Sequence, residues 1–157
     1  MEQSTVPQAV PQEQQEKQIQ TLAENFIEAL HSLEDGSDEE ADQLAMLYSE
    51  DAILTNAALE LGNKKIEGRD AIMRFWVEYK AELGQSRSKF HHITTSDHAA
   101  GLFWTTEGQS PKGETVHYHG VSLLEFDEMG LIKFFRGYYD TRELTVKAAA
   151  DDVSNAA

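Results

Sequence analysis

The chain has 157 residues, of which 40% are hydrophobic and 26% charged, the composition of one globular domain with a sizeable core. Asp and Glu number 28 against 13 Lys and Arg, so the formal net charge is −15, and neither nucleic acid nor an anionic membrane surface is expected as a partner. The chain has no cysteine, which excludes disulfides, thiol catalysis and thiolate metal sites.

The two ends of the sequence differ from its middle. Residues 1–13 are rich in Gln and Pro and have no periodicity, so they are predicted to form a disordered leader. Residues 148–157 are predicted to form a flexible tail, which leaves residues 14–147 for the domain. The N-terminal segment lacks the apolar core of a signal peptide, and no apolar run approaches the length of a membrane span, so a cytoplasmic location is expected.

Three helices are predicted in the first half of the chain. Apolar residues recur at three- and four-residue steps from about residue 14 to Gly36, which is typical of an amphipathic helix. Ser37 followed by Glu40 predicts a capping box at the start of a second helix. A third helix is predicted to open at Gly68 and to end at Gly84.

The remaining segments are predicted to be strands and loops. Residues 51–55 predict a short strand and residues 56–65 a loop. After the third helix the period changes to two, which predicts four strands near residues 89–95, 101–107, 114–126 and 131–140. Three helices followed by an antiparallel meander indicate an α+β fold, in which a strongly curved sheet wraps around the helices as a cone. The hollow inside such a cone must be filled by side chains or by a ligand.

The last hairpin is predicted to be one wall of this pocket. Successive side chains of a strand point to opposite faces, so Tyr118 lies on one face of its strand and the two histidines beside it, His117 and His119, on the other. On the final strand, Phe135 and Tyr139 share a face by the same alternation.

Three segments resemble landmarks of SnoaL-like proteins of the nuclear transport factor 2-like superfamily. They are Tyr48-Ser49-Glu50-Asp51-Ala52, Gly68-Arg69-Asp70-Ala71-Ile72 and Phe135-Arg136-Gly137-Tyr138-Tyr139-Asp140. The resemblance covers roughly residues 15–146 and implies an α+β cone with an internal pocket. The superfamily includes ketosteroid isomerases, polyketide cyclases, scytalone dehydratase and limonene-epoxide hydrolases, alongside many non-catalytic modules.

The limonene-epoxide hydrolase branch looks nearest, but most of its catalytic residues are missing. The resemblance places Gly137 where that branch has a catalytic Asp, and Glu107 and Gln109 near its Arg and second Asp. Leu54 and Asn56 fall where it has Tyr and Asn, so only Asn56 matches. Epoxide hydrolysis is therefore not expected.

Glu107 is the predicted catalytic carboxylate. By alternation it shares a face with Phe103 and Thr105, and the resemblance implies that this face is the inner one. A carboxyl group inside an apolar cavity has a raised pKa and can act as an acid or base near neutrality. The alternative is that the strand has ended and Glu107 is solvated at the rim.

Six residues are predicted to contact the ligand. Tyr118 and Tyr139 could donate hydrogen bonds to a carbonyl or enolate oxygen, or could simply fill the cone. Asn56 could orient a polar ligand group, or could stabilise its own loop. The full predicted set is Leu54, Asn56, Trp76, Tyr118, Phe135 and Tyr139.

The outer face of the sheet suggests a partner rather than a metal. His117 and His119 could bind a metal together, but no third ligand can be placed, so no metal and no cofactor are expected. In the families that the chain resembles, this face packs against a second subunit, which implies a homodimer through the sheet.

The predicted function is that of a pocket protein for a small, mostly apolar molecule. It could be a cofactor-independent isomerase, cyclase, dehydratase or hydrolase that works by proton transfer. The alternative is a non-catalytic binding or dimerisation module whose cavity is closed by its own aromatic residues. The sequence leaves both open. A closed cavity with Tyr118 and Tyr139 hydrogen-bonded to each other would favour the module, and an open apolar cleft would favour an enzyme.

Overall fold

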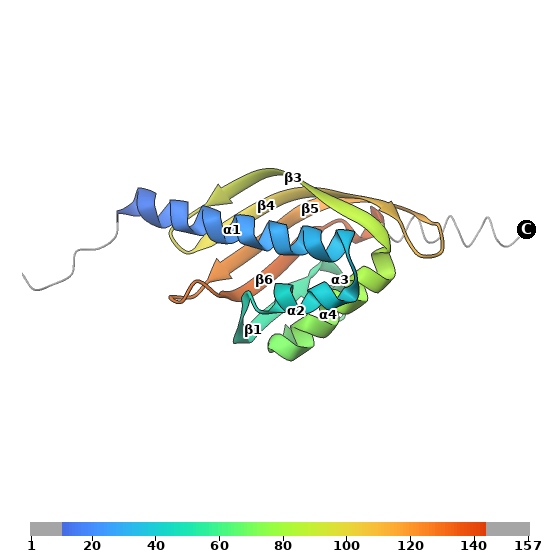
Figure 1. Cartoon of the computed structure of the whole chain (residues 1–157), viewed down its shortest axis with the longest axis horizontal. Coiled ribbons are helices and arrows are strands. Elements are labelled where there is room, and N and C mark those ends of the chain that lie inside the picture. Colours follow the sequence, from blue (N-terminus) through green and yellow to red (C-terminus); the bar gives the residue numbers. More distant parts are fainter. Residues whose placement is uncertain (1–10, 144–157) are drawn as a thin grey trace, which may run out of the picture.

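The computed structural model describes residues 11–143 as one helical layer packed against one curved sheet (Figure 1). The predicted tail, residues 148–157, and most of the predicted leader lie outside this range. The elements follow the chain in the order α1 (Gln12–Asp35), η1 (Asp38–Glu40), α2 (Ala41–Ala45), β1 (Tyr48–Asn56), α3 (Ala57–Leu61), β2 (Ile66–Glu67), α4 (Arg69–Leu83), β3 (Gln85–Thr95), β4 (Ala99–Gln109), β5 (Thr115–Phe126) and β6 (Ile132–Tyr139). This arrangement confirms the predicted α+β cone.

The six strands form a single sheet in the order β2-β1-β6-β5-β4-β3. The meander from β3 to β6 is antiparallel throughout, as predicted. The sheet continues beyond β6 because β1 pairs with β6 in parallel, with Leu54 opposite Phe135 and Asn56 opposite Gly137. This pairing brings the end of β1 to the same edge of the cone as the end of β6.

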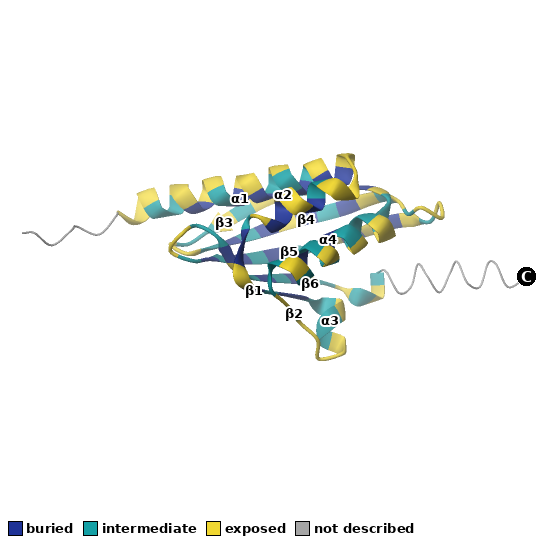
Figure 2. Ribbon diagram, turned by 60° about the horizontal axis from the view of Figure 1, so that its bottom comes forward, coloured by how far each residue is buried: buried dark blue, intermediate teal, exposed yellow. Residues whose placement is uncertain are grey.

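Helix α1 covers the concave face of the sheet with a stripe of apolar residues. Its buried side faces the strands and its other side is exposed (Figure 2). The stripe is set by three- and four-residue spacing, and Phe26 and Leu33 are almost fully buried. Buried apolar area of this kind is the main favourable term in folding. The buried residues of the stripe are Ile19, Ala23, Phe26, Leu30 and Leu33.

Some predicted boundaries and motifs differ from the structure. Helix α1 begins at Gln12, so the last two residues of the predicted leader are helical. Ser37 makes no side-chain capping bond, and a 3₁₀ turn precedes α2, so the capping-box prediction is wrong. The predicted loop at residues 56–65 contains α3, because the Asn56 side chain accepts a hydrogen bond from the Leu59 amide at 2.8 Å and caps a short helix.

No helix within residues 11–143 combines the length and apolar character that crossing a membrane requires.

Candidate functional site

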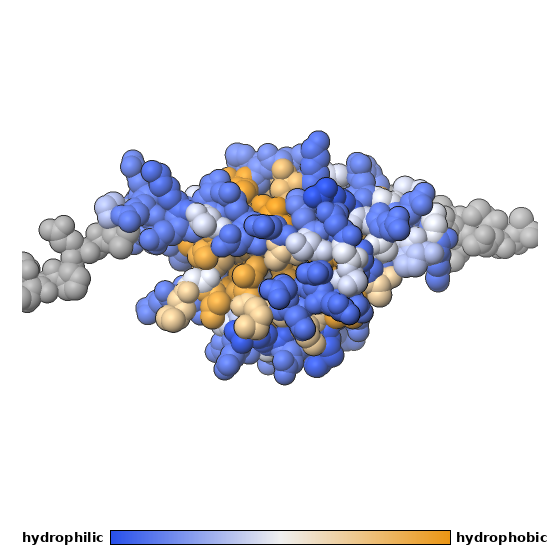
Figure 3. All heavy atoms as spheres, in the orientation of Figure 1, coloured by the Kyte–Doolittle hydropathy of each residue, from blue (hydrophilic) through white to orange (hydrophobic). Residues whose placement is uncertain are grey.

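A cavity of about 390 Å³ lies between the concave face of the sheet and the helices. Hydrophobic side chains gather between α1 and the helices below it in the space-filling view (Figure 3). Most of the cavity wall is apolar, and nine of its residues are aromatic: Phe26, Phe75, Trp76, Tyr79, Phe90, Trp104, Tyr118, Phe135 and Tyr139. A cavity of this volume and lining is of the kind that holds small ligands.

One side of the cavity is built by aromatic rings from α1, α4 and β6. Trp76 packs edge-on against Tyr79 at 5.1 Å and against Phe135 at 5.8 Å between ring centroids. Phe26 contacts the same tryptophan at 6.1 Å. Edge-to-face pairs at these distances are the preferred geometry of aromatic contacts, so the rings form a rigid wall.

The opposite side is a second aromatic cluster, formed by β4, β5 and β6. Trp104 meets Tyr118 edge-on at 5.1 Å, and Tyr118 meets Tyr139 at 5.4 Å. The Trp104 indole donates a hydrogen bond to the Ser122 hydroxyl at 2.9 Å. This bond fixes the indole orientation and uses its only polar hydrogen, so the indole contributes an apolar surface to the cavity.

A buried carboxylate, that of Glu34, lies behind the cavity wall at the end of α1. Only 5% of this residue is exposed. Its Oε1 accepts from the Ser88 amide at 2.8 Å, and its Oε2 accepts from the Tyr79 and Ser88 hydroxyls, each at 2.6 Å. Three donated hydrogen bonds compensate for the loss of water around the buried carboxylate.

The network reaches the cavity through hydroxyl groups. Tyr79, Ser88 and Thr106 all line the cavity, whereas Glu34 does not. The Ser88 hydroxyl hydrogen is used on Glu34, so Thr106 is the donor in the 2.7 Å bond between the two hydroxyls. The pKa of Tyr79 is raised well above its usual value, mainly because the residue is buried and secondly because Glu34 is negatively charged. Tyr79 is therefore protonated at neutral pH.

The Tyr118 side chain brings a hydroxyl group to the cavity. The residue is 7% exposed, and within residues 11–143 no group forms a hydrogen bond with its hydroxyl. Burial raises its pKa, and the nearby Tyr139, Glu34 and Glu82 raise it further. The hydroxyl is therefore protonated at neutral pH and can donate to or accept from a bound molecule.

Five of the six predicted ligand-contacting residues line this cavity: Asn56, Trp76, Tyr118, Phe135 and Tyr139. Leu54 does not. It is fully buried in the hydrophobic core, next to residues that do line the cavity.

Glu107 lies outside the cone, so the prediction that it faces the cavity is wrong. Its side chain is 67% exposed and forms an ion pair with His117 at 3.1 Å between carboxylate and imidazole. The predicted alternation was right, since Phe103 and Glu107 share a face, but that face is the outer one. Trp104 and Thr106 occupy the inner face of the same strand.

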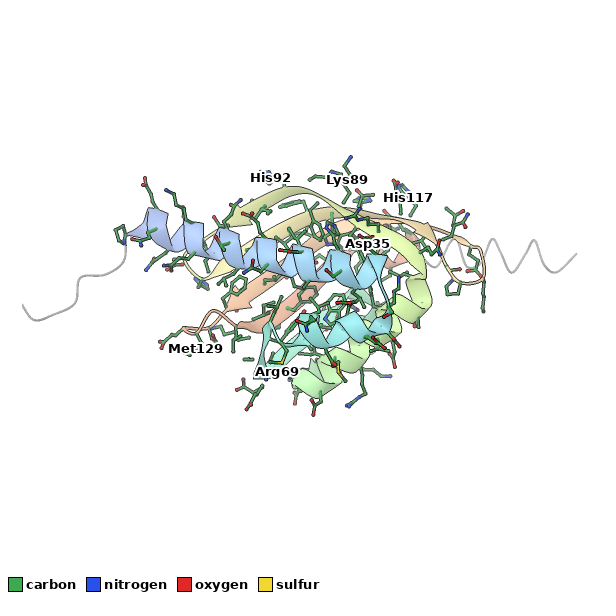
Figure 4. All side chains as sticks on the ribbon, viewed as in Figure 1. Asp35, Arg69, Lys89, His92, His117 and Met129 are labelled. Atoms are coloured by element: carbon green, nitrogen blue, oxygen red, sulfur yellow. The ribbon has the colours of Figure 1, made fainter. Side chains whose placement is uncertain are left out.

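The outer face of the sheet carries the remaining predicted residues. Lys89, His92 and His117 project away from the helices (Figure 4). His119 lies on this face too and pairs with Glu143 at 3.1 Å. Among the described residues, no three His, Asp or Glu side chains are grouped closely enough to hold a metal ion.

The same face exposes aromatic side chains. Phe103 is 39% and Tyr138 is 44% exposed. A homodimer through this face stays a prediction.

Sequence reasoning missed Glu34 and the hydroxyls around it. The signal was present, because Phe26, Leu30 and Glu34 recur at four-residue steps on one face of α1. A carboxylate that continues an apolar stripe is a candidate for a buried charge. Its partner Ser88 lies across the fold on β3 and carries no such signal.

Two comparisons with known proteins match this architecture. The profile of the SnoaL-like domain family matches residues 23–135. A crystal structure of a candidate ketosteroid isomerase from Kribbella flavida DSM 17836 is similar with a TM-score of 0.61, at 20% sequence identity over 79% of this chain and 78% of that chain. At this identity the likeness concerns the fold alone. No curated protein matches the chain. These matches do not test the predicted nearness to limonene-epoxide hydrolases.

Proposed function

The chain belongs to the family of SnoaL-like domains, and we propose on that basis that its cavity binds a small, mostly apolar molecule. The observation that carries this proposal is a cavity of about 390 Å³ with aromatic walls, which Tyr118 also lines. The Tyr118 hydroxyl can form a hydrogen bond with a molecule bound in the cavity, because a phenol both donates and accepts.

The alternative of a non-catalytic dimerisation module finds less support. It would require the cavity to be closed by its own aromatic residues. Tyr118 and Tyr139 meet edge to face, and no bond joins their hydroxyls within residues 11–143. Both rings line the cavity of about 390 Å³ without closing it, which favours a binding pocket.

An apolar ketone such as 4-phenylcyclohexanone is expected to bind in the cavity and to quench the fluorescence of Trp76 and Trp104, which line it. Tyr118→Phe should weaken this binding about 10-fold, because a hydrogen bond of roughly 1 kcal/mol or slightly more is lost. Tyr138→Phe is the matched control, since Tyr138 lies on the outer face and is 44% exposed. Absence of saturable quenching, or equal affinities of the two variants, would contradict the proposal.

Proton transfer is a second candidate function, supported by the Glu34 network. The base that removes a proton next to a carbonyl would be the Tyr79 or Ser88 hydroxyl, which would pass its own proton to Glu34 as it accepts the substrate proton. Both hydroxyls donate to Glu34 at 2.6 Å, so each already points its proton at the carboxylate. Tyr118 would donate to the enolate oxygen that forms.

The isomerisation of a 3-oxo-Δ5-steroid, followed by the ultraviolet absorbance of the conjugated enone, tests this second function. The wild-type chain is expected to accelerate the reaction, and Glu34→Gln should lower kcat about 100-fold or more, because the final proton acceptor is lost. Glu107→Gln should leave kcat unchanged, since Glu107 is on the outer face. Equal losses in both variants would refute the role of Glu34, and no rate above buffer would refute this reaction while leaving ligand binding intact.

A further inference from the structure

The charged residues that line the cavity are all acidic. Among residues 11–143, Glu78 and Glu82 are the only charged side chains of the lining, and both come from α4. A spacing of four residues places them on one helix face, one turn apart. Both are exposed at the rim of the cavity, and within residues 11–143 neither forms an ion pair.

Three basic side chains of α4 and β3 lie near these carboxylates in sequence, and none of them lines the cavity: Arg74, which precedes Glu78 by one helical turn, Lys80 and Arg87. The Lys80 ammonium group donates to the main-chain oxygen of Glu34 at 2.6 Å and to that of Gly84 at 3.1 Å. Arg87 pairs with Asp35 at 3.4 Å, outside the cavity. Lys80 and Arg87 therefore offset part of the negative charge around the cavity, but neither side chain lines it.

The interior of the cavity is negative for two further reasons. Glu34 adds a third carboxylate behind the hydroxyls of Tyr79 and Ser88. The walls are aromatic, and the faces of aromatic rings are electron-rich and attract cations. The raised pKa of Tyr118 reflects this environment. Burial raises this pKa most and Tyr139 raises it next, and the carboxylates of Glu34 and Glu82 raise it further.

We infer that the ligand of this cavity carries a positively charged nitrogen on its apolar skeleton. The inference rests on the proposed ligand-binding function and narrows its ligand class. Glu78 and Glu82 at the rim attract a cation, and the rings of Trp76 and Trp104 give it aromatic faces. The Tyr118 hydroxyl oxygen accepts a hydrogen bond from its N–H.

The same features disfavour ligands that are neutral or negatively charged. An anionic ligand meets the two rim carboxylates and, behind the wall, that of Glu34, while no cationic side chain of residues 11–143 lines the cavity, so its binding is opposed. A neutral ligand of the same shape keeps the apolar contacts but gains neither the attraction of the carboxylates nor the cation–π contacts. The preference for a cation should fall as salt is added, because the two rim carboxylates are exposed and are screened.

A matched series of three probes tests the inference: 4-phenylbutylamine, 4-phenylbutanol and 4-phenylbutyrate. Calorimetry at pH 7 and low salt is expected to show the amine binding about 10-fold more tightly than the alcohol, and the carboxylate binding most weakly. The double variant Glu78→Gln with Glu82→Gln should lower the ratio of the amine affinity to the alcohol affinity from about 10 to near 1. Glu24→Gln with Glu28→Gln is the control, because these exposed residues have the same spacing on α1 and lie outside the cavity.

The outcomes separate this inference from the function on which it rests. If the alcohol or the carboxylate binds as tightly as the amine, the cavity binds small molecules but the inferred charge is wrong. If both double variants weaken the amine equally, the preference comes from the net charge of the chain and the inference fails. If none of the probes binds, both the inference and the proposed binding function are refuted.

Discussion

Replacement of Glu34 with alanine is expected to lower the free energy of unfolding by about 3–5 kcal/mol. The Ser88 amide, the Ser88 hydroxyl and the Tyr79 hydroxyl all donate to this carboxylate at 2.6 to 2.8 Å. Alanine leaves these donors buried without an acceptor, and each unsatisfied donor costs about 1–3 kcal/mol. Urea denaturation followed by tryptophan fluorescence measures the loss.

Asp35→Ala is the matched control for this prediction. Asp35 follows Glu34 in α1, but its side chain is 56% exposed and pairs with an Arg87 side chain that is 59% exposed. Exposed ion pairs contribute little, so the control should change stability by less than about 1 kcal/mol. Similar losses in the two alanine variants would show that the buried network does not hold α1 against β3.

Much of the fold follows from the two periodicities of the sequence. The four-residue steps of Phe26 and Leu30 set the buried side of α1, and the alternation around Tyr118 sets the inner face of β5. Each signal is local, because it depends only on which residues share one face of one element. The predicted inner positions Phe135 and Tyr139 line the cavity for the same reason.

Alternation assigns residues to two faces but does not say which face is inside. On β4 both faces carry an aromatic residue, Trp104 on one and Phe103 on the other, so the aromatic residues alone do not decide between the two faces. The choice was made by resemblance and placed Glu107 inside. The structure places Trp104 inside together with Ala100 and Leu102, and its indole donates a hydrogen bond to Ser122 on β5, a contact that the sequence pattern does not carry.

Long-range contacts account for the other features that sequence reasoning missed. The parallel pairing of β1 with β6 joins segments about eighty residues apart, and it brings Asn56 to the cavity beside Gly137. The Glu34 network likewise joins the end of α1 to Ser88, which is 54 residues away. Neither partner can be identified from the periodicity of its own segment.

Gly120→Ala is expected to lower the free energy of unfolding by about 3 kcal/mol or more. A Cβ at this position would lie 2.1 Å from the Tyr138 main-chain oxygen and 2.9 Å from Cζ2 of Trp104. The main-chain oxygen belongs to the neighbouring strand β6 and can withdraw only if the β5–β6 pairing opens. In a chain of this length the loss should lower Tm by roughly 6–12 °C, measured by circular dichroism.

Gly101→Ala is the control in the neighbouring strand. There the added Cβ would meet the Thr94 hydroxyl at 2.7 Å, but this oxygen is on a side chain that can rotate away, and the next contacts are at 3.9 Å or beyond. The control should therefore change stability by less than about 1 kcal/mol.

Because Trp104 and Tyr139 both lie against Gly120 and both line the cavity, Gly120→Ala should also weaken binding of any cavity ligand. Equal stability of the two variants would mean that β5 and β6 can separate at little cost, and the aromatic wall built on them would then not be rigid.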